Sequence, residues 1–135
     1  MKELAVRLTA GMDLKQSICT IAEKNNIQAG VILSAVGCLS RIHLRLATAQ
    51  YELEKENHYE IVSLSGTIAS NGVHLHISAS DQNAQTIGGH LLDGCIVNTT
   101  CELVIGILEE YSFYREFDPA TGYRELTVKT IDESA

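Results

Sequence analysis

The sequence has no tryptophan, one proline and no run of about 18 apolar residues that would suggest a transmembrane helix. Its 135 residues are 45% hydrophobic, which is typical of a folded globular protein rather than a disordered or collagen-like one. The first residues also lack the charged and then apolar segments of a signal peptide. We therefore expect a cytoplasmic protein with no membrane partner.

Paired cysteines are also absent from the sequence. The four cysteines, Cys19, Cys38, Cys95 and Cys101, include no Cys-x-x-Cys pair for zinc binding or redox chemistry. Cys95 and Cys101 would lie roughly 20 Å apart along one strand, which is too far for a local disulfide. We predict that all four are small buried hydrophobic residues.

Basic residues are scarce, with ten Lys and Arg against seventeen Asp and Glu and a net charge of −7. Duplex-DNA binders usually present a basic face, because neutralising phosphates supplies most of their non-specific affinity. The densest basic group here is Arg41, His43 and Arg45. The composition argues against tight DNA binding by one chain, although an oligomer could gather a few arginines on one surface.

Hydrophobic periodicity predicts one helix and about seven strands. The helix is expected at about residues 14–25, because Asp13 is suited to an N-cap and Gln16 follows three residues later. Residues 50–57 are expected to form an exposed hairpin or loop, and the polar stretch 81–89 a connector that turns at its glycine pair. The predicted strands are 2–9, 30–39, 42–46, 59–68, 73–78, 95–108 and a final piece at 113–131 with a turn at 118–122.

This order of elements predicts an α+β fold in a single domain spanning residues 1–135. Mostly short connections between strands favour an antiparallel sheet with one principal helix. A chain of 135 residues is long enough for one domain with a hydrophobic core and too short for two stable domains.

The most informative motif consists of three histidines. His74 and His76 are two apart, so on a strand they point to the same face, about 6.6 Å apart by rise. His90 follows a glycine pair and can reach them from a neighbouring segment. Three neutral imidazoles with an open fourth position are typical of a catalytic zinc site, although nickel, copper or iron also accept this ligand type. The alternative is a polar strand face and a loop histidine bonded to backbone.

Hydrolysis or hydration at such a zinc ion would also need a general acid or base. Glu102 and Asp81 are the acidic residues nearest these motifs in the sequence. Glu102 lies in an apolar run, so we expect it to orient a histidine, to pair with a cation across a subunit interface, or to face solvent from an open sheet. Arg41 and Arg45 share a strand face, where a solvated edge is favoured over contact with an anionic ligand.

Five segments together resemble one known family. They are 60–66, 72–76, 88–91, 95–97 with Glu102, and 118–122, in the same order and spacing across essentially the whole chain. They closely resemble the plants-and-prokaryotes conserved (PPC) domain family. The resemblance implies a compact α+β fold, a homotrimer and, as in some prokaryotic members, a metal held by His74, His76 and His90.

Two sequence features connect plant members of this family to DNA and to partner proteins. This sequence lacks the first and matches the second only in part. Plant members join the domain to AT-hooks, short Arg-Gly-Arg-Pro segments that enter the minor groove, and no such segment occurs here. The plant domain also carries a Gly-Arg-Phe-Glu-Ile-Leu stretch linked to partner recruitment. Residues 57–62 match it at Glu60 and Ile61, which are the candidate partner contacts, and place His58 at the arginine position.

Two functional hypotheses follow. The first is a trimeric, metal-binding PPC protein with a DNA-binding or transcription-linked regulatory role. The second is a zinc-dependent enzyme or ligand sensor that binds a small molecule at the three-histidine site. The family description favours the first, which is the function that we predict, while the net charge favours the second, which is the alternative.

Overall fold

The computed structural model describes residues 1–131, which form eight strands and one helix. All strand pairs are antiparallel, so the predicted α+β class with one principal helix is confirmed. The elements are β1 (Lys2–Thr9), α1 (Leu14–Lys24), β2 (Ala29–Arg45), β3 (Glu52–Ala69), β4 (Gly72–Ser80), β5 (Thr86–Leu91), β6 (Ile96–Ile107), β7 (Tyr111–Asp118) and β8 (Tyr123–Thr130).

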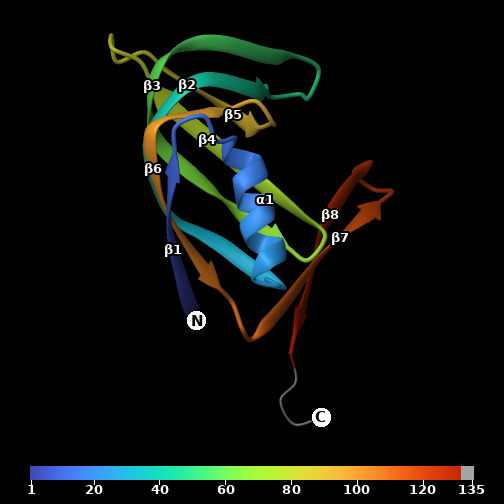
Figure 1. Cartoon of the computed structure of the whole chain (residues 1–135). Coiled ribbons are helices and arrows are strands. Elements are labelled where there is room, and N and C mark those ends of the chain that lie inside the picture. Colours follow the sequence, from blue (N-terminus) through green and yellow to red (C-terminus); the bar gives the residue numbers. More distant parts are fainter. Residues whose placement is uncertain (132–135) are drawn as a thin grey trace.

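Six strands form one curved sheet in the order β1-β6-β2-β3-β4-β5 (Figure 1). The long strand β2 pairs with β3 and β6 over most of its length, and its last residues also pair with β5. This extra pairing places Leu44 opposite Leu91 and Arg45 opposite His90. Strands β7 and β8 form a separate two-stranded hairpin.

Helix α1 lies in front of the curved sheet in Figure 1 and supplies part of its core. Leu14 and Ile18 are fully buried, and the Asp13 carboxylate accepts a hydrogen bond from the Gln16 N–H at 3.0 Å. The predicted helix and its N-cap are therefore confirmed. Helix α1 has 11 residues. Residues 1–131 contain no helix that is long and apolar enough to span a membrane.

The structure corrects one predicted strand boundary and resolves an open alternative at another. Strand β2 is continuous where two strands were predicted, because a register shift between Leu39 and Arg41 lets it bend without ending. Most of the stretch 50–57, predicted as an exposed hairpin or loop, belongs to β3 and pairs with β2 in an exposed hairpin. Its side chains are mostly exposed and charged, and Glu54 pairs with Arg41 across the strands at 3.1 Å, so no buried face marks it as a strand.

Gly88 and Gly89 lie inside β5 rather than in the predicted turn. A Cβ atom on Gly88 would lie 2.7 Å from the Ile77 carbonyl oxygen, and one on Gly89 would lie 2.8 Å from the Arg45 carbonyl oxygen. The glycine pair therefore allows β5 to fit closely between β4 and β2. We expect this close fit to position His90, which follows directly in β5.

The cysteines agree only partly with the prediction of burial. Cys95 and Cys101 are buried, whereas Cys19 and Cys38 are half-buried, and all four are free thiols. Burial raises the pKa of the Cys95 and Cys101 thiols to about 11, so both stay protonated at neutral pH. Protonated, buried thiols are poor metal ligands and poor nucleophiles.

Candidate metal centre

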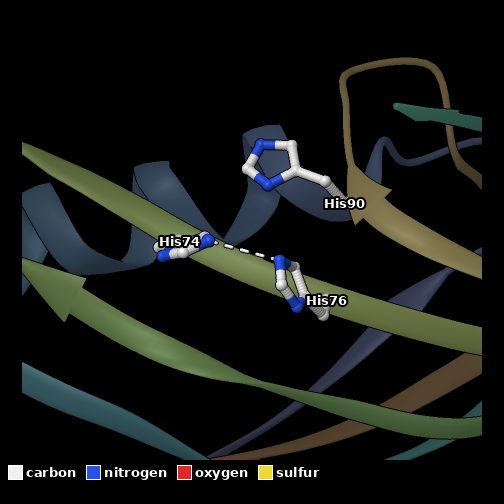
Figure 2. A group of neighbouring side chains, drawn as sticks. All are labelled: His74, His76 and His90. Carbon is white, nitrogen blue, oxygen red and sulfur yellow. Dashed lines mark hydrogen bonds between the residues drawn. The ribbon is translucent and has the colours of Figure 1, made fainter. Parts of the chain in front are cut away.

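The three histidines meet on the exposed side of the β4–β5 pair. On β4, His74 and His76 point outward while Leu75 and Ile77 are buried, as the strand alternation predicted. His90 on β5 lies directly opposite His76 in the strand register. Figure 2 shows the three rings converging on a common space.

The ring nitrogens lie at distances suited to one metal ion. The Nε2 atoms of His74 and His76 are 3.2 Å apart, and one nitrogen from each of the three rings lies within 4.8 Å of the others. A tetrahedral zinc ion with Zn–N bonds of about 2.0–2.1 Å places two ligand nitrogens roughly 3.3 Å apart. The His74–His76 pair meets this spacing, and the His90 nitrogen lies somewhat farther out, within 4.8 Å of both.

His90 also carries a nitrogen that lacks a hydrogen-bond partner. Its Nδ1 atom is buried and unpaired within the described residues. Leaving such an atom unsatisfied costs about 1–3 kcal/mol. In Figure 2 one nitrogen of the His90 ring faces the gap between the other two rings. A metal ion in that gap would bind this His90 nitrogen together with one nitrogen each of His74 and His76. The three histidines are therefore suited to hold a metal ion.

The site lowers the pKa of two of its imidazoles, those of His74 and His90. Burial, followed by the charge of Arg45 and the other two histidines, lowers the pKa of His90 to about 4. Burial, followed by the charge of Arg115, also lowers the pKa of His74 below its usual value. Both rings are therefore unprotonated at pH 7, which is the form that binds metals.

A cavity of about 400 Å³ opens beside His74 and His90. This volume lies within the range of roughly 300–1,000 Å³ found for small-molecule pockets. A second hollow of about 600 Å³ adjoins His76 and His90, so the histidines lie between two spaces. The chemically active residues that line the first cavity with the histidines are Arg45, Arg115, Tyr123, Arg124 and Glu125.

The structure places Glu102 and Asp81 away from the histidines. Glu102 is exposed on β6, opposite Arg7 of β1. The Asp81 carboxylate accepts hydrogen bonds from the N–H groups of Asn83 and Gln85 in the β4–β5 connection. Neither residue lines the two spaces beside the histidines. A role for either in acid–base chemistry at this site therefore has no geometric support.

The β7–β8 hairpin brings residues to the site that sequence reasoning missed. The Arg115 backbone N–H donates to Asn71 Oδ1 at 2.7 Å, and its guanidinium donates to Thr67 Oγ1 at 2.8 Å. Thr67 is the cross-strand neighbour of His74. Glu125 reaches the same cavity from β8. No local pattern signals this arrangement, because it depends on how the hairpin docks against the β3–β4 turn.

Arg45 was assigned to a solvated edge, and this prediction was wrong. It is half-buried, lies opposite His90 and lines both spaces beside the histidines. The β2–β5 pairing causes this placement, because it brings the end of β2 against the histidine strand. Arg41 differs, since its guanidinium pairs with Glu54.

The two residues predicted to contact a partner, Glu60 and Ile61, lie on β3 and do not line the two spaces beside the histidines. Glu60 is exposed on β3, whereas Ile61 is only 8% exposed and belongs to the core. Glu60 lines a separate hollow with His58 and Asp81. Glu60 can therefore face a partner in this conformation, and Ile61 cannot. Partner docking at this stretch stays a prediction.

The sequence of the chain matches the model of a known protein family and two known proteins. The model of the Plants and Prokaryotes Conserved (PCC) domain matches residues 1–109. Two Synechococcus proteins named bifunctional protein GlmU are 44% identical to the chain over 131 and 129 residues, or 97% and 96% of its length. The chain spans only 21% of each of these relatives.

Several solved protein structures are also similar to this chain. A hypothetical protein of Salmonella is 33% identical with a TM-score of 0.92, over 96% of this chain and 94% of that one. A metal-containing protein of Archaeoglobus fulgidus is 27% identical with a TM-score of 0.76, over 94% of each chain. A Bacteroides thetaiotaomicron protein with a provisional DNA-binding assignment is 23% identical with a TM-score of 0.83, over 93% of this chain and 91% of that one. This similarity shows that the two proteins share a fold. The chain belongs to the Plants and Prokaryotes Conserved (PCC) domain family, the PPC family that its sequence motifs resemble.

Proposed function

We propose that the chain binds one divalent transition metal through His74, His76 and His90 and uses this site to bind a small molecule. Zinc is the ion that three imidazoles and neutral pH favour. The observation that carries the proposal is the convergence of the three rings, with the unpaired His90 Nδ1 buried beside them. The metal-containing relative from Archaeoglobus fulgidus also supports it.

When bound, zinc supplies a Lewis acid that lowers the pKa of a coordinated water to about 7. The chain's own contribution is to fix the three rings on a paired β4–β5 ladder and to lower the pKa of His74 and of His90. Glu125 is the one acidic side chain among the described residues that line the first cavity. We therefore propose Glu125, rather than Glu102 or Asp81, as the group that would exchange a proton with a bound molecule.

Elemental analysis of untagged protein purified without chelator tests this proposal. About one zinc, or another divalent transition metal, per chain is expected from a three-histidine site. A metal content near zero that zinc addition does not raise would contradict the proposal. A screen of small metabolites by thermal shift, run on zinc-loaded and chelator-treated protein, then tests whether ligand binding depends on the metal.

A DNA-linked regulatory role is a second proposal, which the relative with a DNA-binding assignment supports and the charge opposes. Each chain carries −7, and assembly of several chains adds to the repulsion. We expect non-specific duplex binding at physiological salt to be weaker than the usual range of about 10⁻⁴–10⁻⁶ M. A gel shift with micromolar affinity and a steep salt dependence would instead favour the DNA-linked role.

We also propose that the protein is a homotrimer, as the resemblance to the PPC family implies. The β7–β8 hairpin exposes large apolar side chains on both of its faces, Tyr114 and Tyr123 on one and Phe117 and Val128 on the other, each at least 50% exposed. Extensive exposed apolar surface of this kind is typical of a subunit interface. Light scattering should therefore give three times the mass of 14.7 kDa. A stable monomer at micromolar concentration would remove this proposal.

We propose that residues 1–135 act as one domain. Most buried residues of α1 and the six-stranded sheet belong to one core cluster, and a small cluster around Phe113 joins the hairpin to the sheet. In the GlmU relatives the matching region is about a fifth of the protein, at 21%.

A further inference from the structure

We infer that the cavity beside the three histidines binds the carboxylate or phosphate group of a small molecule, and that Arg45 and Arg115 hold this group. The inference rests on the proposed metal site, because the ion would supply part of the positive charge. It adds the class of ligand and the residues that select it.

The charge around the cavity contrasts with the charge of the chain. The chain has five arginines, and three of them, Arg45, Arg115 and Arg124, line this cavity. Glu125 is the one acidic residue among the described lining residues, so the side chains other than histidine leave an excess of two positive charges (3 − 1 = 2). An excess of this kind in a protein with a net charge of −7 marks a place suited to an anion.

Arg115 is held in place and still has unused donors. Its guanidinium donates to Thr67 Oγ1 at 2.8 Å, while its Nε atom is buried without a partner. Among residues 1–131 it forms no ion pair, unlike Arg41, which pairs with Glu54. Glu125 is the nearby acidic group that favours the charged form of Arg115, but it makes no ion pair with it, so the half-buried guanidinium can still accept an anion.

Arg45 approaches the same space from the opposite strand. It faces His90 in the β2–β5 register and also lacks an ion-pair partner within residues 1–131. Arg45 and Arg115 both line the cavity that opens beside His74 and His90. The two guanidinium groups therefore act on the space in front of the histidines.

The size of the cavity and the arginine geometry define the ligand. About 400 Å³ admits a small molecule and excludes most of a protein or a duplex. The planar guanidinium donates two parallel hydrogen bonds to a carboxylate or a phosphate, and a neutral ligand would leave these donors unpaired. A small organic acid or a small phosphate compound meets these requirements.

Calorimetric titration of the zinc-loaded protein with pyruvate and with inorganic phosphate tests the inference, with glycerol as the neutral control. At least one anion should bind, glycerol should not, and the tighter anion identifies the kind of group. Arg115→Gln and Arg45→Gln should each weaken binding by about 10- to 100-fold, as expected for loss of a charged hydrogen bond. Arg41→Gln, which removes the same charge outside the cavity, should bind like the wild type.

Zinc content and thermal unfolding, measured on the same samples, separate the possible results. Arg115→Lys keeps the charge but loses the planar fork, so it should fold and bind with intermediate affinity. Unchanged binding in both glutamine variants, equal loss in Arg41→Gln, or no binding of either anion to zinc-loaded wild type would overturn the inference. Arginine-dependent anion binding by a protein that takes up no zinc would support the arginine site and refute the metal site.

Discussion

Replacement of His76 by alanine is expected to reduce bound zinc from about one equivalent per chain to a negligible amount. The two remaining imidazoles, on β4 and β5, cannot hold the ion without a third protein ligand. No cysteine takes part in the metal-binding group found among the described residues, and the two buried thiols stay protonated. Elemental analysis after dialysis against a zinc-containing buffer and then a zinc-free one measures the change.

His43→Ala and His58→Ala are the matched controls and should keep full zinc content. His43 lies elsewhere and bonds the Asp93 carbonyl oxygen at 2.8 Å and Glu52 at 2.9 Å. His58 lies near Asn98 at 3.3 Å. His76→Ala should still fold, because a core of this size does not depend on a metal as a zinc finger does. Full zinc content in His76→Ala would mean that the histidines form only a polar strand face.

Replacement of Gly89 by alanine is the second large change that we expect. The new methyl group would lie 2.8 Å from the Arg45 carbonyl oxygen, which is backbone and cannot rotate away. Strand β5 must shift, at a cost of about 1–3 kcal/mol in the free energy of unfolding. The shift moves the adjacent His90, so the zinc affinity should fall by at least tenfold. Denaturant unfolding and a zinc titration measure the two effects.

Gly11→Ala provides a control that separates stability from zinc binding. Gly11 has a φ of +91° and no atom near the added methyl group, so alanine there strains the backbone without displacing a neighbour. We expect a loss of about 1–2 kcal/mol in stability and no change in zinc affinity. Equal zinc affinity in Gly89→Ala and the wild type would show that the close fit of β5 does not position His90.

The sequence predicts those parts of the fold and of the site that depend on local patterns. Alternation along 73–78 places His74 and His76 outward, and the side chain of Asp13 caps α1. The glycine pair before His90 marks the third histidine segment, although its role is close packing of strands rather than a turn. Each of these features arises from residues within a few positions of one another.

Long-range docking accounts for what the sequence does not predict. Arg115 and Glu125 reach the histidines because the β7–β8 hairpin packs against the β3–β4 turn, through bonds such as Asn71 to Arg115. Arg45 reaches them because β2 continues past its bulge to meet β5. Residues 52–57 are polar apart from Leu53, so the periodicity that normally reveals a strand is missing there.

X-ray absorption spectroscopy of the zinc-loaded protein tests the central claim most directly, because it reports the atoms bound to the metal. We predict three imidazole nitrogens at about 2.0–2.1 Å, with a light atom completing the coordination. The histidine contribution should disappear in His76→Ala together with the bound metal. A sulfur atom at about 2.3 Å, or a set of oxygen ligands without imidazole, would show that the metal binds elsewhere and would contradict the three-histidine site.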